Sequence, residues 1–372
     1  MEKFLPEICT IQYGFPFDSA KFSTSEGMPL IRIRDVVRGY SETFTTEEYK
    51  EEYIVSKDDL LIGMDGEFNI AKWGETPALL NQRVCRLFPT SEVDKNYLFY
   101  FMPSALKRIE EKTPFVTVKH LSAKELNKVK VPLPPLDEQR RIAAVLDKVS
   151  DLIAKRRAQL DKLNLLVKAR FVEMFENTDE NILLSDVAEV TGGLTKNSKR
   201  KDLPIKLPYL RVANVFFDAI DTNEILEIGV TEEEKSKTLL RNGDLLFVEG
   251  NGSPEQIGRV AVWRDEIVPC VHQNHLIKAR FNMEKMLPVY AMNYFMTQKG
   301  REQIKAKAVS TSGLYTLSVS KIESLYVPFA PMDAQLQFTS FKEKIDKSKL
   351  TIRKSLDKLE VLKKALMQQY FG

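Results

Sequence analysis

The sequence has few of the residues that build disulfide frameworks or metal sites. Only three cysteines (Cys9, Cys85 and Cys270) and three histidines occur among 372 residues, and no two cysteines stand at a metal-ligand spacing. His272 and His275 have no third ligand near them in the sequence. We therefore expect neither a disulfide framework nor a metal site, as is usual in a reducing compartment.

Long apolar runs are also absent. No segment approaches the roughly 18 consecutive apolar residues that a transmembrane helix needs. The first residues, MEKFLPEICTIQYGFPF, lack the basic segment and following apolar segment of a signal peptide. These absences predict a soluble cytoplasmic protein.

The motifs of common catalytic and cofactor sites are missing as well. There is no phosphate-binding GxxxxGK(S/T) loop, no adenine-methyltransferase (D/N)PP(Y/F/W) sequence and no nuclease-type PD…(D/E)xK arrangement. Gly250-Asn251-Gly252 begins like a dinucleotide-binding fingerprint, but Glu255 stands where the third glycine belongs. The sequence therefore predicts a non-catalytic chain that holds no cofactor of its own.

What the chain does contain is an internal duplication. Residues 118–175 align without a gap to residues 314–371, 196 positions further along. Upstream of this run the similarity is weaker but present. The matched pairs and segments include Leu121/Leu317, Pro132/Pro328, Asp137/Asp333, Gln139/Gln335, Leu160–Leu163 with Leu356–Leu359, Pro29–Ile33 with Pro208–Val212, Asp59–Ile62 with Asp244–Phe247, and Asn81–Val84 with His272–His275. The sequence thus predicts two copies of one unit, each a diverged globular part followed by a well-matched tail.

Each tail predicts a long helix. Residues 138–175 and 334–371 contain no proline or glycine, and in the second tail apolar residues recur every seven positions at Phe338, Ile345, Ile352, Leu359 and Leu366. Such heptads indicate a coiled coil, and the matched register favours pairing of the two helices with each other. About 34 helical residues span roughly 50 Å. A dimerisation stalk is the alternative, but it fits poorly because one helix follows each globular part.

The globular halves show short β-type runs broken by turn residues, with helices toward the end of each half. The fold class that we predict is α+β. Two tandem α+β domains are each followed by a long helix, and the two helices pair as an antiparallel coiled coil with pseudo-twofold symmetry. The predicted bounds are 1–135 and 176–331 for the domains and 136–175 and 332–372 for the helices. The predicted strands are Leu30–Val36, Asp59–Met64, Gln82–Leu87, Leu210–Val215, Asp244–Val248, Val260–Trp263 and Leu276–Phe281, and the predicted helices within the domains are Asn96–Lys107 and Pro288–Lys305.

Charge does not mark the whole chain as a nucleic-acid binder, because the net charge is only +3. A DNA-binding face would therefore be local. Basic clusters can hold phosphates, and the polar loops Gly63–Asn69 and Glu249–Gln256 offer amides for reading base edges. The alternative is that these groups form ordinary solvated faces or support the backbone. The candidate DNA-binding residues are Arg32, Arg34, Asn69, Lys72, Gln82, Arg83, Lys119, Lys199, Arg200, Arg211, Asn251, Ser253, Gln256, Gln273 and Asn274.

The run Pro132–Gln139 (PLPPLDEQ), followed by Arg140-Arg141-Ile142-Ala143, resembles a region of type I restriction-modification specificity subunits. The order of domain, helix, domain, helix is similar to that family over the whole chain. The second copy departs from the motif at Ala334, where the first has Glu138.

The resemblance implies two target-recognition domains that each read one half of a split double-stranded DNA sequence, with the helices as a ruler between the halves. It also implies that two modification (methyltransferase) subunits dock on the helices and that restriction (translocase-nuclease) subunits join through them. S-adenosylmethionine, ATP and Mg would then be bound by those partners. Two alternatives stay open: a specificity subunit of a related system in which nuclease and methylase share one polypeptide, or a coiled-coil adaptor that does not bind DNA.

Overall fold

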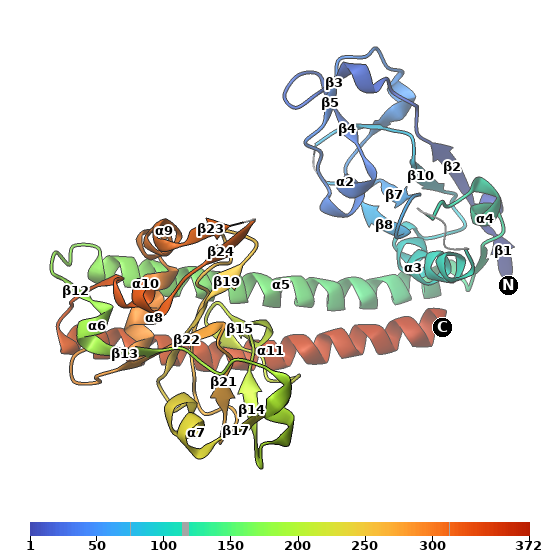
Figure 1. Ribbon diagram of the computed structural model, residues 1–372. Helices are drawn as coiled ribbons and strands as arrows, with labels where there is room; N and C mark the ends of the chain where they lie inside the picture. The colour runs from blue at the N-terminus through green and yellow to red at the C-terminus, as the bar shows by residue number, and fades with distance from the viewer. Residues whose placement is uncertain (75, 114–118, 312) are drawn as a thin grey trace. The chain divides into compact units, whose positions relative to one another are not determined.

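The computed structural model describes residues 1–74, 76–113, 119–311 and 313–372 and divides into two compact units (Figure 1). The first unit consists of Met1–Arg157 and Lys354–Gly372, and the second of Ala158–Arg353. Each unit contains one globular α+β part, called domain 1 in the first unit and domain 2 in the second. Each long helix is shared between the units, so that half of it packs with each domain.

The two long helices are α5 (Leu136–Phe175) and α11 (Met332–Phe371), as the duplicated tails predict. In the first unit, Arg157 of α5 pairs with Glu360 of α11 at 2.7 Å. Ile142, earlier in α5, shares an apolar cluster with Phe371, later in α11. The two helix segments of this unit therefore run antiparallel, which confirms the predicted pairing.

In the second unit, the other halves of α5 and α11 meet through aromatic rings. The Phe338 ring centroid lies 5.1 Å from that of Phe171 and 5.8 Å from that of Phe175. Because the end of α5 lies beside the start of α11, these segments are antiparallel too. In each unit, therefore, the core of the domain includes residues from both long helices.

Domain 1 is built on a four-stranded antiparallel sheet, β2-β10-β7-β8, and a five-stranded sheet, β3-β5-β4-β9-β6, in which β4 and β9 run parallel. A two-stranded sheet, β1-β11, adjoins α5 in sequence. The strands are β1 (Glu2–Phe4), β2 (Cys9–Tyr13), β3 (Phe22–Ser23), β4 (Met28–Ile31), β5 (Phe44–Thr45), β6 (Ile54–Val55), β7 (Leu60–Gly63), β8 (Asn69–Lys72), β9 (Ala78–Leu80), β10 (Val84–Pro89) and β11 (Lys130–Pro132). The helices are α1 (Leu5–Ile8), η1 (Ser19–Lys21), α2 (Ile33–Arg38), η2 (Glu51–Tyr53), α3 (Lys95–Lys112) and α4 (Ala123–Asn127).

Domain 2 repeats this plan with a four-stranded sheet, β13-β22-β18-β20, and a three-stranded sheet, β17-β14-β21, in which β14 and β21 run parallel. Three small sheets, β12-β25, β15-β16 and β19-β24-β23, complete it. The strands are β12 (Asn181–Leu183), β13 (Ala188–Thr191), β14 (Ile205–Leu210), β15 (Val215–Phe216), β16 (Ala219–Ile220), β17 (Leu226–Val230), β18 (Leu245–Val248), β19 (Gly250–Asn251), β20 (Val260–Val262), β21 (Val271–His272), β22 (Leu276–Phe281), β23 (Val309–Thr311), β24 (Leu314–Thr316) and β25 (Tyr326–Pro328). The helices are α6 (Leu184–Val187), η3 (Ser198–Asp202), η4 (Val212–Asn214), α7 (Glu232–Thr238), α8 (Pro288–Met296), α9 (Gln298–Lys307) and α10 (Val319–Glu323).

The central strands are the apolar runs that the sequence predicts. β7 (LLIG) and β18 (LLFV) are buried at every position, as expected for strands that are covered on both faces. The four-stranded sheets have the same strand order in both domains, and each domain has a parallel strand pair in its second sheet. The duplication therefore extends through the diverged globular parts. The α+β class and the tandem layout are therefore confirmed.

Two predicted strands end earlier than expected. The segments Leu30–Val36 and Leu210–Val215 leave the sheet at Ile31 and Leu210, and α2 and η4 begin. The cause is a capping interaction three residues ahead: the Asp35 carboxylate accepts the Arg32 amide at 2.9 Å, and the Asn214 carboxamide oxygen accepts the Arg211 amide at 2.9 Å. A side chain that satisfies a free amide in this way favours a helical turn over a strand.

The predicted helix Pro288–Lys305 is two helices, α8 and α9, that break at Thr297. The Thr297 hydroxyl accepts the Gly300 amide at 3.2 Å and so caps α9. Gly300 lies so close to α8 that a Cβ there would be 2.2 Å from the Tyr294 carbonyl oxygen. A side chain at this position would therefore push the two helices apart.

In each domain a tyrosine also holds the last strand before the long helix. The Tyr97 hydroxyl donates to the Pro132 carbonyl, and the Tyr290 hydroxyl donates to the Pro328 carbonyl, both at 2.9 Å.

In the described part of the chain, no helix is long and apolar enough to cross a membrane. The three cysteines are buried thiols, and burial raises the pKa of each to about 12.

Candidate nucleic-acid interface

Domain 1 presents a short polar turn, Asn81–Arg83, which we call polar turn 1. It joins β9 of the five-stranded sheet to β10 of the four-stranded sheet. The Phe15 amide donates to the Leu80 carbonyl at 3.0 Å, and the Phe15 carbonyl accepts the Gln82 amide at 2.9 Å. These bonds leave the Gln82 and Arg83 side chains exposed at the surface.

The chain passes very close to polar turn 1 at Gly14. A Cβ on Gly14 would lie 2.0 Å from the Asn81 carbonyl oxygen, a distance that no side chain tolerates. Gly193 has the same role in domain 2, where a Cβ would lie 2.3 Å from the His272 carbonyl oxygen. Glycine is therefore required at both positions, because only a residue without a Cβ allows the chain after β2 or β13 to pass so close to the polar turn.

Polar turn 2 is Gln273–His275, which joins β21 to β22 in domain 2. The Leu194 amide donates to the His272 carbonyl at 2.8 Å, and the Leu194 carbonyl accepts the Asn274 amide at 2.9 Å. These are the bonds that Phe15 makes in domain 1. The two polar turns are thus built in the same way, and both contain residues that the sequence singled out.

The structure corrects the predicted alignment of the two turns by one residue. The sequence placed Asn81 opposite His272, but the β-bridges Phe15–Asn81 and Leu194–Gln273 equate Asn81 with Gln273. Gln82 therefore corresponds to Asn274, and Arg83 corresponds to His275. Backbone pairing sets this register, and the few side chains shared by the two segments are not enough to reveal it.

The two predicted polar loops lie next to the polar turns. The Met64 amide donates to the Arg83 carbonyl, and the Glu249 amide donates to the His275 carbonyl, both at 2.9 Å. The predicted loop and turn residues therefore meet at one edge of each domain. This edge is the candidate nucleic-acid interface.

Acidic side chains orient the basic residue of each turn. In domain 1, Asp65 lies 3.6 Å from Arg83 Nε and 2.5 Å from His120 Nδ1, and His120 Nδ1 lies 3.2 Å from Arg83 Nη1. In domain 2, Glu249 lies 2.7 Å from His275 Nδ1. The Arg83 and His275 side chains remain 52% and 55% exposed, so each is held in place yet accessible to a ligand.

The loop of domain 2 is ordered by its own polar groups. The Asn251 carboxamide oxygen accepts the Ser253 amide at 2.9 Å, and the Ser253 carbonyl accepts the Gln256 amide at 3.0 Å. Asn69 in domain 1 donates to the Glu67 carbonyl at 3.0 Å and pairs with Gly63 across the sheet. Some polar groups that the sequence suggests for base contacts, on Asn251, Ser253 and Asn69, therefore already make hydrogen bonds within the loops.

Two predicted arginines stand at equivalent places beside the central sheets. Arg32 precedes α2 and is exposed, whereas Arg211 precedes η4 and donates to the Glu224 carboxylate at 3.1 Å. Arg34 is 52% exposed, with Asp35 at 3.6 Å. Ile33, between the two domain 1 arginines, lies near Gly63, so this basic pair is close to the end of β7.

The side chains of three other predicted residues bond to groups of their own domain or its long helix. Lys72 lies 3.9 Å from Asp147 of α5 and 5.0 Å from the Phe99 ring. Lys119 Nζ donates to the Glu110 carbonyl at 2.8 Å, and the Lys119 carbonyl accepts the Gly66 amide of the predicted loop at 2.9 Å. Arg200 binds the Glu234 carboxylate and the Gly229 carbonyl, with its neighbour Lys199 exposed. Lys72, Lys119 and Arg200 therefore contribute to packing, and none of them lies on a polar turn.

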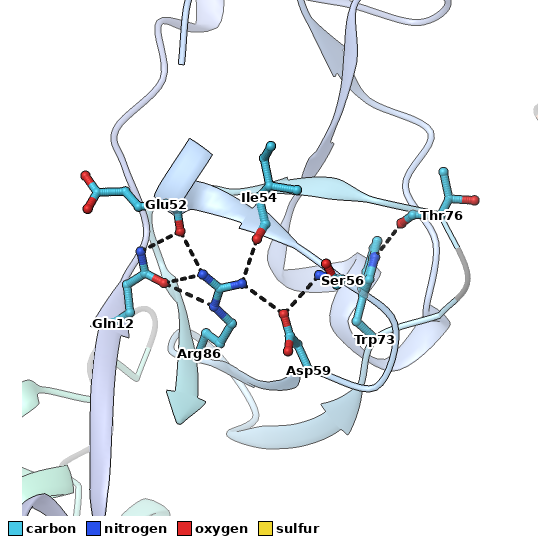
Figure 2. Close-up of polar contacts among 8 residues, drawn as sticks. All are labelled: Gln12, Glu52, Ile54, Ser56, Asp59, Trp73, Thr76 and Arg86. Atoms are coloured by element: carbon cyan, nitrogen blue, oxygen red, sulfur yellow. Dashed lines mark hydrogen bonds and ion pairs between the residues drawn. The ribbon is translucent and has the colours of Figure 1, made fainter. Parts of the chain in front are cut away.

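The sequence reasoning missed a buried arginine behind polar turn 1. Figure 2 shows the Arg86 guanidinium at the centre of a polar network, with bonds to the Gln12 side chain, the Glu52 and Ile54 carbonyls and the Asp59 carboxylate. The five distances lie between 2.6 and 3.1 Å, since Gln12 accepts two of the bonds. Arg86 is visible in the sequence as the one charge within the apolar run Val84–Leu87.

The equivalent position in domain 2 is Lys278, since Arg86 pairs with Leu61 of β7 and Lys278 with Leu246 of β18. Lys278 Nζ donates to the Lys237 carbonyl at 2.9 Å, and the side chain of Arg280 donates to Asp244 and to the Leu239 carbonyl. Burial, followed by the neighbouring charge of Arg280, lowers the pKa of Lys278 to about 8. Burial and Lys278 lower the pKa of His272 to about 4, so its ring is neutral at pH 7.

Acidic, cysteine and histidine side chains do not gather into a metal-binding group within residues 1–74, 76–113, 119–311 and 313–372. The interface therefore consists of amide, guanidinium and imidazole groups on two similar scaffolds. Amides and guanidinium groups are the side chains that most often read base edges in the major groove. The arrangement is suited to recognition of a polar surface such as DNA.

Comparison with known proteins identifies the family of this fold. The sequence profile of the type I restriction modification DNA specificity domain matches residues 1–164 and 178–363. The EcoBI type I restriction enzyme specificity subunit of Escherichia coli is 39% identical over 197 residues, which cover 52% of this chain and 39% of that subunit. The EcoKI specificity subunit of Escherichia coli K12 is 24% identical over 367 residues, 89% of this chain and 78% of that one.

Solved structures agree at the level of the fold. The S subunit of a type I restriction-modification system from M. genitalium superimposes with a TM-score of 0.60 at 14% identity, covering 100% of this chain and 96% of that one. A chain from a structure that describes assembly and conformational transition of a type I system gives a TM-score of 0.55 at 16% identity, covering 100% and 97%.

Proposed function

The chain belongs to the family of type I restriction-modification DNA specificity subunits, and from this premise we propose that domain 1 and domain 2 each read one half of a split DNA sequence. In this family the specificity subunit is non-catalytic and determines which DNA sequence the enzyme acts on. Reading would take place at the polar turns and their adjoining loops. The residues proposed for base contacts are Gln82 and Arg83 in domain 1 and Gln273 and Asn274 in domain 2, with Asn251 in the loop.

One observation carries the proposal: the two domains present unlike polar groups on the same scaffold. Gln82 corresponds to Asn274 and Arg83 to His275, and Gln273 takes the place of Asn81, whose side chain is buried and accepts the Gln82 amide. Arginine pairs with guanine and amides pair with adenine, so a different set of groups selects a different set of bases. We therefore infer that the two DNA halves differ in sequence and that the complete site is asymmetric.

Phosphate contacts would position each domain, while base contacts would choose the sequence. Arg32 and Arg34, near the end of β7, and Lys199, on η3, are exposed cations suited to phosphates. We infer that the lengths of α5 and α11 set the number of base pairs between the two halves. Each of these helices has 40 residues.

We also infer two docking sites for modification subunits on the long helices. Leu165 and Leu166 of α5 are 63% and 47% exposed, and Val361 and Leu362, at the equivalent places on α11, are 69% and 45% exposed. An exposed apolar pair that recurs at the same place in both copies favours two equal contacts with one kind of partner. The modification subunits would bind S-adenosylmethionine, and restriction subunits with ATP and Mg would join through them.

The test is to map methylated adenines in DNA from cells that express the chain with its modification subunits. A two-part sequence that changes when one domain is replaced would support the proposal. A coiled-coil adaptor without DNA contacts would leave the methylated sequence unchanged after such a replacement. A related system with nuclease and methylase in one polypeptide would give the same DNA result but a different set of co-purifying chains.

A further inference from the structure

Each polar turn joins two strands that belong to different sheets. In domain 1, β9 lies in the five-stranded sheet and β10 in the four-stranded sheet, so the two strands diverge from polar turn 1. In domain 2, β21 and β22 diverge from polar turn 2 in the same way. The direction in which such a turn presents its side chains depends on the angle between its two strands. The angle between the two strands must therefore be fixed for the turn to discriminate between the correct base and the other bases.

In domain 1, Arg86 of β10 bonds to Ile54 of the strand that pairs with β9 (Figure 2). It extends from β10 and donates to the Ile54 carbonyl at 2.6 Å, and Ile54 of β6 pairs with Leu79 of β9. Arg86 also donates to the Glu52 carbonyl at 2.7 Å, and the Gln12 amide reaches the same carbonyl at 2.9 Å. Arg86 is therefore tied to β9 through β6, three positions beyond the end of polar turn 1.

In domain 2, two cations on β22 make the corresponding connection. Lys278 donates to the Lys237 carbonyl at 2.9 Å, and Arg280 donates to the Leu239 carbonyl at 3.0 Å. The next residue, Leu240, donates its amide to the Cys270 carbonyl at 2.9 Å, directly before β21. Thus β22 is tied to the strand on the other side of polar turn 2 through the segment Lys237–Leu240.

Both connections include a carboxylate at the same place in the duplicated fold. Asp59 accepts the Ser56 amide at 2.9 Å and Arg86 Nη1 at 2.9 Å. Asp244 accepts the Arg241 amide at 2.8 Å and Arg280 Nη2 at 2.7 Å. Each carboxylate precedes a central strand, β7 or β18, and so anchors its cation to the rigid middle of the domain.

We propose that Arg86 in domain 1, and Lys278 with Arg280 in domain 2, are positioning residues that fix the angle between the strands of each polar turn and so determine how strictly each DNA half is read. This inference rests on the proposed function. A buried charge is an unfavourable way to join two sheets, because apolar residues of similar size would avoid its desolvation. The cations make directional hydrogen bonds to specific carbonyls. Such bonds fix the orientation of one strand relative to the other, which an apolar contact does not do.

The experiment uses the full chain co-expressed with its modification subunits and DNA libraries in which each base of the site is varied. A specific protein discriminates against a single base change by about ten- to a hundredfold. We expect Arg86→Met to reduce that discrimination by about tenfold in the DNA half read by domain 1 and to leave the other half unchanged. Lys278→Met should do the same for the half read by domain 2. Arg86→Lys, which retains a donor at this position, should restore part of the discrimination.

Lys342→Met is the matched control for Lys278→Met. Lys342 is also buried in the second unit, with Nζ 2.8 Å from Asp218 and 2.7 Å from Asp346, but it lies on α11 and not on a strand of polar turn 2. We expect this variant to keep wild-type discrimination in both halves, even if it unfolds more easily. If Arg86→Met does not fold, Lys278→Met decides, because Lys278 Nζ donates to the Lys237 carbonyl alone and its loss leaves fewer groups without a partner than the loss of Arg86.

The two proposals fail in different ways. If the wild-type complex shows no dependence on DNA sequence, the proposed function is wrong. If the wild type is sequence-specific and the Met variants of Arg86 and Lys278 retain its discrimination in both halves, the positioning role is wrong. Equal relaxation of both halves by either variant would also overturn it, since that result indicates general loosening of the complex.

Discussion

Gln139 and Gln335, 196 residues apart, make the same three hydrogen bonds in the two units. The Gln139 side chain accepts the Asp94 amide and donates to the Glu92 and Pro134 carbonyls at 2.9, 3.2 and 2.9 Å. Gln335 accepts the Leu287 amide and donates to the Lys285 and Ala330 carbonyls at 2.9, 3.4 and 2.8 Å. Both side chains are buried. Each glutamine therefore fastens the start of a long helix to the helix-bearing part of the preceding domain.

Replacing one of these glutamines should destabilise one unit. Gln139→Leu removes the partner that the buried Gln139 side chain gives to the Asp94 amide and to the Glu92 and Pro134 carbonyls, and a polar group left unpaired away from water costs about 1–3 kcal/mol. We expect the unfolding transition of domain 1 to move to lower urea while that of domain 2 stays in place. Gln335→Leu should give the opposite pattern. Equal shifts of both transitions after either substitution would show that the glutamines do not act locally.

Arg83 should contribute to the reading of one DNA half only. Truncation by Arg83→Ala removes an exposed guanidinium that is oriented by Asp65, and loss of a good base contact costs about 1–3 kcal/mol. We expect reduced discrimination at one position in the half read by domain 1, measured by methylation of DNA duplexes with single base changes. Asp65→Asn is a useful companion, since it keeps Arg83 but weakens its orientation, and its effect should be smaller. An effect of Arg83→Ala on both halves would argue against a local contact.

Lys278 should give domain 2 a distinctive pH dependence of stability. Its pKa is about 8 in the folded protein and about 10.5 when unfolded, so between these values the unfolded chain binds more protons and stability rises with pH. Below pH 8 the buried charge costs on the order of 3 kcal/mol, since each pKa unit corresponds to about 1.4 kcal/mol. The charged groups around it are Arg280, Asp244, Glu189 and Arg241.

Urea unfolding between pH 7 and pH 10.5 tests this expectation. Lys278→Met should be at least as stable as the wild type at pH 7, and the difference between the two should shrink as the pH rises. The opposite trend, with the variant less stable at pH 7 and more stable at pH 10, would contradict the expected sign of the pH dependence.

The exposed apolar pairs on the helices should matter for assembly and not for folding. Replacing Leu165 and Leu166 by glutamine removes only exposed side chains, and surface substitutions usually change stability by less than about 0.5 kcal/mol. We expect native mass spectrometry to show loss of one modification subunit, and loss of the other when Val361 and Leu362 are replaced. Retention of both subunits in both variants would place docking elsewhere.

The long helices, the duplication and the central strands could be predicted because their signals are local and strong. The LDKL repeat at Leu160–Leu163 and Leu356–Leu359 and the absence of proline and glycine mark the helices directly. The apolar runs of β7 and β18 mark the middle of each domain. By contrast, the ends of β4 and β14 depend on single capping side chains, Asp35 and Asn214, which have no effect on apolar periodicity.

The candidate interface could be predicted only in part. Gln82, Arg83, Gln273 and Asn274 stood out as polar residues that follow or precede apolar strands, and the structure brings them to the polar turns. The exact correspondence of the turns required the backbone pairing of Phe15 and Leu194. Arg200 and Lys119 looked like basic surface, but their carboxylate and carbonyl partners lie 34 and 9 residues away in the chain. Arg86 and Lys278 look like solvent-facing charges within strands, and only the folded structure reveals the Ile54 and Lys237 carbonyls that they bind.

The most direct test of the account is a map of methylated adenines, read on single long DNA molecules, in cells that express the chain with its modification subunits. The account predicts one recurring pattern of two short, unlike base sequences separated by a gap of constant length. It also predicts that exchanging residues 81–83 for those of another specificity subunit changes one of the two sequences and leaves the other, and the gap, as they were. A single continuous sequence, or a pattern that does not respond to changes in either polar turn, would contradict it.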